Sequence, residues 1–159
     1  MASLPYSQVW LAFLFLLVFG CTHKKTELHI YPFQSYGWPA AQPVCLQYHI
    51  EPAGETWNFL YQIQYDEQMP FQNIWLKYQL ISPDGDTLAQ SVDNLFLFEP
   101  NTGKPMGNGV KIRQYRNAYF LKNVRLANPG KYEIRLWHYM RTDSLRGIQA
   151  IGVQTEPAA

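Results

Sequence analysis

The chain is 159 residues long and carries a formal net charge of +1, with 47% hydrophobic, 16% aromatic and 16% charged residues. That length fits one domain with a single core. The near-neutral charge argues against binding to nucleic acid, because such proteins usually carry a large excess of basic residues. The 25 aromatic residues exclude a disordered chain, which could not bury so much apolar surface. These features indicate a compact, aromatic-rich globular domain.

The N-terminus differs from the rest of the chain. Residues 1–20 contain no charged side chain and include an apolar run of eleven residues, Val9–Phe19. This run is too short for a transmembrane helix, which needs about 20 apolar residues, and is typical of a secretory signal peptide. It leads into Val18-Phe19-Gly20-Cys21, which resembles the lipobox of bacterial lipoproteins. The resemblance implies that residues 1–20 are a lipoprotein signal peptide and that Cys21 carries acyl chains such as palmitate. The alternative, a buried apolar segment beside a free cysteine, does not explain where the charges begin.

Residues 21–43 are predicted to form a lipid-anchored tether. The segment Thr22–Glu27 is polar and basic, and Tyr31–Pro43 contains three prolines and one glycine, which favours a loop or an extended edge over a helix. With Cys21 lipidated, Cys45 has no cysteine partner, so no intramolecular disulfide is expected. Because Cys45 lies in an alternating run, we expect a half-buried structural thiol.

From residue 44 onward the sequence has the period of β-strands. Apolar residues alternate with polar ones over 44–50, 57–65, 74–80 and 132–140, and no window sustains a helical period. Turn signals lie between strands at Ser82-Pro83-Asp84-Gly85 and Ala127-Asn128-Pro129-Gly130. This pattern indicates an antiparallel sandwich or barrel. We predict a single all-β domain over residues 44–159, an antiparallel β-sandwich of the jelly-roll or immunoglobulin-like type.

The small net charge hides an uneven distribution. Residues 51–99 hold eight acids and one base, whereas residues 104–146 hold ten bases and two acids. One interpretation is that the two halves pair across the sheets. The other is a basic surface that faces an anionic partner, such as lipid head groups or an acidic protein. The sequence leaves both open.

No pattern typical of catalysis, metal binding or cofactor binding is present. The four histidines lack the spacing of a zinc site, and His138 is expected to be a hydrogen-bonded core residue. Asp84-Gly85-Asp86 lacks the further ligands of an EF-hand loop, and Gly103–Gly109 lacks the order of a P-loop. We therefore expect a protein that is not an enzyme and that uses no metal or cofactor.

Two features are candidate binding sites. The glycine-rich segment is predicted to be a long loop with basic residues in and after it, and loops commonly carry binding residues: Lys104, Lys111, Arg113 and Arg116. Trp75, Trp137 and Tyr139 lie opposite the main apolar row of their strands. Either both faces of that sheet are buried, which we favour because a covered sheet needs apolar residues on both faces, or an aromatic platform is exposed.

Several short segments, in their order and spacing, resemble the gliding-motility lipoprotein family GldH over roughly residues 57–155. The segments are Met69–Leu76, Asp86–Leu88, Gly103-Lys104 with Met106–Gly109, Asn123-Val124, Pro129–Tyr132, Met140-Arg141, Gly147-Ile148 and Ile151–Val153. The resemblance implies a lipid-anchored protein of the Bacteroidota cell envelope, a noncatalytic component needed for gliding and associated type IX secretion. It carries over no catalytic residue.

The expected location and partners follow from the tether and the resemblance. Thr22 after the lipidated cysteine favours the outer membrane, and the Lys24-Lys25 pair favours its periplasmic leaflet over the cell surface. Partners are the membrane, through the N-terminal lipid, and other proteins of the gliding or secretion machinery, bound through the 103–116 loop. The alternative is a lipid-anchored carbohydrate-binding β-sandwich module, in which exposed aromatic rings stack on sugars.

Overall fold

The computed structural model describes residues 26–34, 37–51 and 54–158, apart from the side chains of residues 114–117. All regular elements in these ranges are strands: β1 (Glu27–Pro32), β2 (Trp38–Pro39), β3 (Val44–Ile50), β4 (Thr56–Tyr65), β5 (Asn73–Ile81), β6 (Thr87–Phe96), β7 (Arg113–Arg125), β8 (Gly130–His138), β9 (Ser144–Leu145) and β10 (Ile148–Pro157). The predicted all-β class is therefore confirmed.

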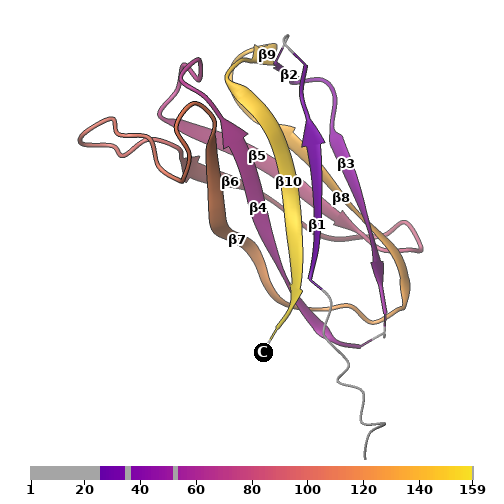
Figure 1. Ribbon diagram of the computed structural model, residues 1–159. Helices are drawn as coiled ribbons and strands as arrows, with labels where there is room; N and C mark the ends of the chain where they lie inside the picture. Colours follow the sequence, from indigo (N-terminus) through magenta and orange to yellow (C-terminus); the bar gives the residue numbers. More distant parts are fainter. Residues whose placement is uncertain (1–25, 35–36, 52–53, 159) are drawn as a thin grey trace, which may run out of the picture.

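The long strands form two four-stranded antiparallel sheets that pack face to face (Figure 1). The front sheet has the order β1-β10-β4-β7 and the back sheet the order β3-β8-β5-β6, while β2 and β9 form a short pair at one end. The pairings are nested, with β5 on β6, β4 on β7, β3 on β8 and β1 on β10. One long hairpin wound into two sheets gives this nesting, which is the jelly-roll topology. The single β-sandwich prediction is confirmed, in its jelly-roll form.

The core lies between the sheets and is built from the alternating rows that the sequence marked. In the front sheet, β4 contributes Trp57, Phe59, Tyr61, Ile63 and Tyr65, all at most 5% exposed. In the back sheet, the inward residues of β3, β5 and β8 are buried in the same core. Burying such aromatic and branched side chains stabilises a fold by about 1.5–3 kcal/mol each relative to leaving them in water.

The folded domain begins earlier than predicted. β1 pairs with β10 over its whole length, from Glu27 to Pro32. Trp38 of β2 is fully buried, and its ring stacks on Phe33 with the centroids 5.1 Å apart. Residues 27–43 thus contain strands and core side chains, which differs from the boundary placed between a tether at 21–43 and a sandwich at 44–159. The difference arises because prolines, which suggested a loop, are also tolerated on edge strands and strand ends.

Buried tyrosines connect the two sheets. The Tyr48 hydroxyl of the back sheet donates to the Val153 carbonyl of the front sheet at 2.6 Å. The Tyr61 hydroxyl of the front sheet donates to the Asp93 carboxylate of β6 at 3.0 Å. Burial raises the pKa of both hydroxyls, so both remain protonated donors at neutral pH. These bonds fix the position of one sheet relative to the other.

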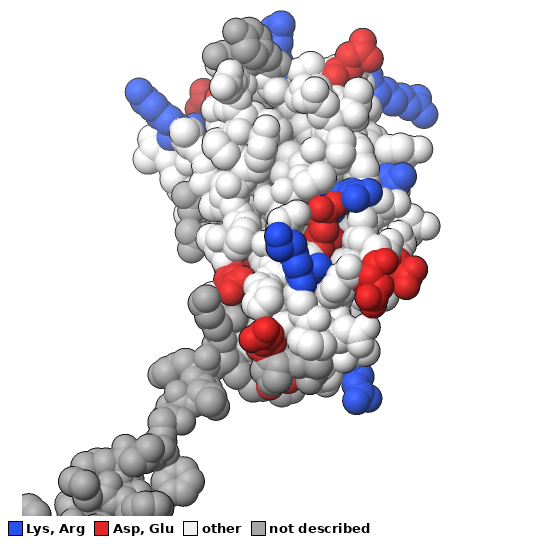
Figure 2. Space-filling model, turned by 90° about the vertical axis from the view of Figure 1, so that its right-hand side faces the viewer, with Lys and Arg blue, Asp and Glu red and all other residues white. Residues whose placement is uncertain are grey.

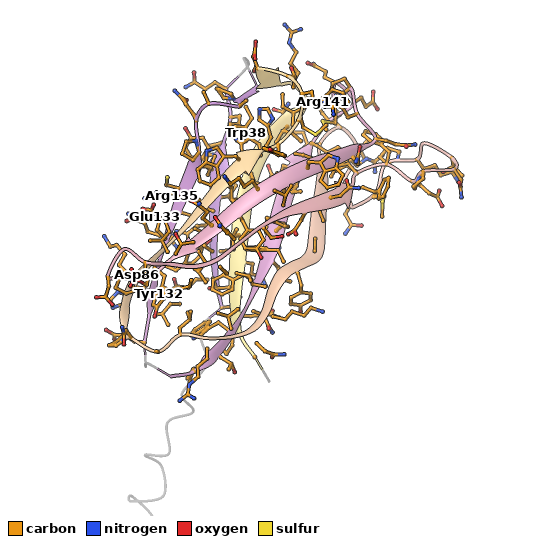
Figure 3. All side chains as sticks on the ribbon, turned by 180° about the vertical axis from the view of Figure 1, so that it is seen from behind. Trp38, Asp86, Tyr132, Glu133, Arg135 and Arg141 are labelled. Atoms are coloured by element: carbon orange, nitrogen blue, oxygen red, sulfur yellow. The ribbon has the colours of Figure 1, made fainter. Side chains whose placement is uncertain are left out.

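Both predicted turns are present and they contact each other at the end of the sandwich away from β2 and β9. In the first, the Gly85 amide donates to the Ser82 carbonyl at 3.0 Å, and Gly85 has a positive φ of 91° that favours glycine. The Asn128 side chain of the second turn donates to Asp84 of the first at 3.1 Å. The Tyr132 hydroxyl then donates back to the Asn128 carbonyl at 2.7 Å, in the manner of a tyrosine corner (Figure 3).

Candidate functional site

A groove on the outer face of the back sheet is the best candidate for a binding site. Its volume is about 560 Å³, and it lies where β5 and β6 meet the loops that follow β4 and β8. We call it the aromatic groove, and its lining residues are Phe71, Asn73, Trp75, Val92, Tyr139, Met140 and Arg141. Pockets of this size commonly bind small molecules or part of a larger ligand.

Strand alternation directs Trp75 into this groove. Its neighbours Ile74 and Leu76 point into the core and are fully buried, so Trp75 points outward and is 42% exposed. The Tyr139 amide donates to the Trp75 carbonyl at 2.7 Å, which continues the β5–β8 pairing one residue beyond the end of β8. The side chain of Tyr139 is 64% exposed. Two large rings therefore lie on neighbouring segments of one open face.

Polar groups border the rings. The Asn73 amide donates to the Asn94 side-chain oxygen at 2.5 Å, across β5 and β6. Arg141 is exposed and lies at the end of the sandwich that carries β2 and β9 (Figure 3). The groove thus combines flat apolar surfaces with amide and guanidinium donors. Such a surface can stack on apolar rings or faces and donate hydrogen bonds to oxygen acceptors.

The two predicted tryptophans lie on the same face but in different surroundings. We expected burial, and for Trp75 this is wrong, because no second layer in the described structure covers this side of the back sheet. Trp137 of β8 is half-buried and lies opposite Lys77 of β5, whose ammonium group is 5.3 Å from the centroid of the indole ring. Trp75 lines the groove, whereas Trp137 lies beside it.

The structure separates the predicted basic loop from the aromatic groove. Lys104 and Lys111 are exposed in the loop between β6 and β7, which projects from the sandwich (Figure 1). Arg113 begins β7, and its guanidinium donates to the Gly109 carbonyl at the end of that loop. The side chain of Arg116 lies outside the described part. The described basic residues of this loop do not line the groove.

The uneven charge along the chain does not produce pairing between its halves among the described residues. The ion pairs found there are Glu27 with His29, Glu51 with His49, and Glu133 with Arg135 at 2.5 Å. None joins an acid of residues 51–99 to a lysine or arginine of residues 104–146. On the face shown in Figure 2, acidic and basic side chains lie interspersed. Among the described side chains, the halves are therefore not joined by the cross-sheet ion pairs that one interpretation predicted.

Two residues considered for chemistry have different environments from those expected. Cys45 is exposed, not half-buried, because β3 is an edge strand whose outer face is open. Partial burial, and Glu133 nearby, raise the pKa of its thiol, which disfavours the reactive thiolate. His138 is buried as predicted, but neither ring nitrogen has a hydrogen-bond partner among the described residues. Burial lowers the pKa of His138, so the neutral ring is favoured.

Some predictions cannot be placed on this structure. Residues 1–20 and the lipid attachment residue Cys21 lie outside the described residues. Within residues 26–34, 37–51 and 54–158, no helix is long and apolar enough to cross a membrane. In the same ranges, no group of three or more His, Cys, Asp or Glu residues is placed to hold a metal ion.

Sequence reasoning missed part of the groove, although a signal was available. Phe71, Met140 and Arg141 were not singled out, because each residue type is ordinary in a loop or strand. All three lie in segments that carry the family resemblance, Met69–Leu76 and Met140-Arg141. The structure brings these two segments together at one groove.

Comparison with solved structures gives weak matches. Among solved structures, the infectious bursal disease virus VP2 subviral particle is 9% identical, with a TM-score of 0.43 over 86% of this chain and 33% of that one. Dimeric latent PorU from Porphyromonas gingivalis is 11% identical, with a TM-score of 0.38 over 85% and 13%. The chain thus spans a third or less of these structures, and likeness at this level carries no functional argument.

The sequence matches are more informative. The gliding motility lipoprotein GldH of Flavobacterium johnsoniae is 22% identical over 148 residues, which cover 89% of this chain and 90% of the relative. The family described as GldH lipoprotein matches residues 27–155. That match starts at the first residue of β1 and ends within β10, so it spans the whole sandwich. The chain therefore belongs to the GldH lipoprotein family.

Proposed function

We propose that this protein is a noncatalytic component needed for gliding motility and associated type IX secretion. In this proposal it is anchored by lipid on Cys21 to the periplasmic leaflet of the outer membrane and binds other proteins of the machinery. The observation that carries the proposal is the match over the entire sandwich to a relative named for gliding motility, of which 90% is covered. The lipobox and the aromatic groove support the anchor and the binding role.

The motility proposal is tested by deleting the gene and complementing it. Deletion is expected to abolish the spreading of colonies and the surface display of secreted adhesins, and the wild-type gene is expected to restore both. A deletion strain that spreads and displays adhesins normally would contradict the proposal.

The anchor needs a separate readout. Cys21→Ala is expected to stop labelling by radioactive palmitate and to release the protein from the membrane fraction. Cys45→Ala is the matched control, because Cys45 is an exposed cysteine in the same chain, and it should leave labelling and fractionation unchanged. Continued labelling of Cys21→Ala would refute the lipobox assignment.

The groove is tested by complementation with Trp75→Ala. The Trp75 side chain is 42% exposed, and Tyr119 on the front sheet is exposed to the same degree, so Tyr119→Ala is a matched control for loss of a surface ring. If the groove binds a partner of the machinery, Trp75→Ala reduces spreading while Tyr119→Ala does not. Equal spreading by both variants, at equal protein level, would remove the groove from the proposal.

The exposed rings of Trp75 and Tyr139 favour a second candidate, a lipid-anchored carbohydrate-binding module. Aromatic rings on an open sheet face can stack on the apolar faces of sugars. Titration with a panel of envelope and plant glycans is expected to change the tryptophan fluorescence, and Trp75→Ala should remove most of that change. The absence of a response across the panel would count against this candidate.

A further inference from the structure

The outer edge strand of the back sheet, β6, has few of the features that normally protect an edge. It is ten residues long, and within the described residues its only strand neighbour is β5. Natural edge strands are usually short, kinked, proline-containing or charged, because an open edge can pair with another chain. β6 contains no proline, lysine or arginine, and Asp93 is its single charged residue. Its free main-chain groups therefore form a template for another strand.

The two edges of the front sheet, β1 and β7, are less suited to pairing. β1 ends at a proline, Pro32, and is six residues long. β7 has several register irregularities against β4 and carries Arg113, Arg116, Lys122 and Arg125. β6 has one register shift near its start and the inward Asp93, but it has none of the prolines or basic residues that these strands carry.

The side chains of β6 form two distinct rows. Register against β5 places Gln90, Val92, Asn94 and Phe96 on the outer face of the sheet, and Leu88, which lies at the register shift between Thr87 and Ala89, is exposed at the end of this row. Leu88, Val92 and Phe96 are 48%, 38% and 40% exposed, so three apolar side chains lie in water along one strand. The inward row contains Ala89, Ser91, Asp93 and Leu95. An added strand would cover the apolar part of the outer row.

The outer row is self-complementary about its central residue. If a second β6 runs antiparallel with Val92 opposite Val92, then Leu88 lies opposite Phe96 and Gln90 opposite Asn94. Apolar residues thus meet apolar residues, and amides meet amides. Residues directly opposite in an antiparallel pair always share a face, so this register is allowed for a continuous sheet.

The same register also places compatible residues opposite each other in the inward row. Ala89 lies opposite Leu95, and Ser91 lies opposite Asp93, where the hydroxyl can donate to the carboxylate. No like charges meet, because Asp93 does not face its own copy. A one-residue shift would place outer residues opposite inner ones and lose this agreement.

We propose that two copies of this protein associate through antiparallel pairing of their β6 strands, with a two-fold axis at Val92. The two back sheets then form one eight-stranded sheet, and each copy presents the same strand to the other, as a closed two-fold dimer requires. Main-chain hydrogen bonds supply the pairing, and the Val92, Leu88 and Phe96 contacts supply apolar burial. Val92 also lines the aromatic groove, so the tests below measure association of two copies directly and not motility.

Cross-linking of the full-length protein in envelope membranes tests the axis. In a Cys45→Ala background, Val92→Cys places two thiols opposite each other across the proposed axis, within the reach of a disulfide. A mild oxidant should convert most of the protein to a species of twice the mass that reductant reverses. Gln79→Cys, on the same face but on the inner strand β5, is the control and should stay monomeric. A Val92→Cys yield no higher than that of the control, or a cross-link to a different protein instead, overturns the proposal.

A charge-swap experiment tests the same axis without cysteine. Differently tagged wild-type copies should co-purify, whereas two copies of Val92→Lys, or two of Val92→Glu, should co-purify several-fold less, because like charges meet at the axis. Co-expressing Val92→Lys with Val92→Glu should restore co-purification. Val92 is an exposed position, so both variants are expected to fold. Equal recovery from like and unlike pairs would show that Val92 does not face its own copy.

Discussion

The inner strands of the two sheets differ in how far their outer faces are covered. On the front sheet, Leu60 and Gln62 point outward yet are only 3% and 7% exposed, and the Gln62 amide donates to Gln154 at 3.3 Å. On the back sheet, Trp75 and Tyr139 are 42% and 64% exposed. The centre of the front face is closed by its own neighbouring side chains, and its exposed apolar residues, such as Tyr119, lie on the edge strands, whereas the back face leaves Trp75 of an inner strand in water. Uncovered apolar surface of this kind commonly marks an interaction site.

The largest expected effect separates the inside of the back sheet from its outside. Leu76→Ala should lower the free energy of unfolding by about 2–5 kcal/mol, because the side chain is fully buried and its removal leaves a cavity. Trp75→Ala, one residue earlier but on the outer face, should change it by less than about 1 kcal/mol, since surface substitutions are usually small. Chemical denaturation of both variants measures this difference. Similar losses for the two would mean that Trp75 is part of the core.

A smaller effect is expected at the bond between the sheets. Tyr48→Phe removes a buried hydroxyl that donates to the Val153 carbonyl and should cost about 1–3 kcal/mol, because that carbonyl loses its donor in the interior. The control is Tyr119→Phe, which removes an exposed hydroxyl from the front face and its bond to Glu156. Thermal or chemical unfolding should show little change for the control. Equal stability of both variants would show that the sheets are positioned without this bond.

The contact between the Lys77 ammonium group and the Trp137 ring should contribute less to stability than the Tyr48 hydrogen bond. Lys77→Met keeps most of the side-chain length but removes the ammonium group over the indole, so we expect a loss of about 0.5–1 kcal/mol. The matched change is Lys131→Met, which lies on the same outer face of the back sheet but on β8. No ring contact of Lys131 is found between described residues. Urea titration of the two variants compares them. An equal effect would mean that the ring contact adds nothing to stability.

The smallest expected effect is on how the free energy of unfolding changes with pH. Burial raises the pKa of Asp93, with Tyr61 opposing part of that rise, so the folded state favours the protonated carboxyl more than the unfolded state does. Its contribution to stability is therefore present below the ordinary pKa near 4 and is lost as the pH rises through the higher folded value. Relative to Asp93→Asn, the wild-type protein should lose stability between pH 4 and pH 7. The prediction would be contradicted if the free energies of unfolding of the wild-type protein and Asp93→Asn changed with pH in parallel.

The sequence predicted some of the long strands well and others poorly. β3, β4, β5 and β8 were found because each carries an unbroken apolar row that faces the core. β6 was missed because it is an edge strand whose rows both mix apolar and polar residues, and β1 falls in a segment for which the sequence left a loop or an extended edge open. In β10, the outward position between Ile151 and Val153 is Gly152, whose small size lets Ile30 of β1 lie across it. These differences follow from the neighbours of each strand, which alternation alone does not reveal.

The groove was only partly predictable. Trp75 and Tyr139 were noted from their place on the strand, but their exposure depends on whether a second layer covers the sheet. The sequence extended the last predicted strand to residue 140, whereas β8 ends at His138. That early end lets Met140 turn toward β5, where its sulfur accepts the Trp75 amide at 3.3 Å. Long-range placement of two loops, not a local motif, produces the site.

If Cys21 carries the proposed lipid, the early start of β1 limits how far this domain can move from a membrane. Glu27 is already paired with β10, and it lies six positions after Cys21 in the sequence. Even fully extended, such a segment spans only about 20 Å. With lipid on both copies of the proposed dimer, the two anchors reach one leaflet only if the two-fold axis stands perpendicular to it. The joined back sheet would then lie parallel to the bilayer, with both aromatic grooves on the same side.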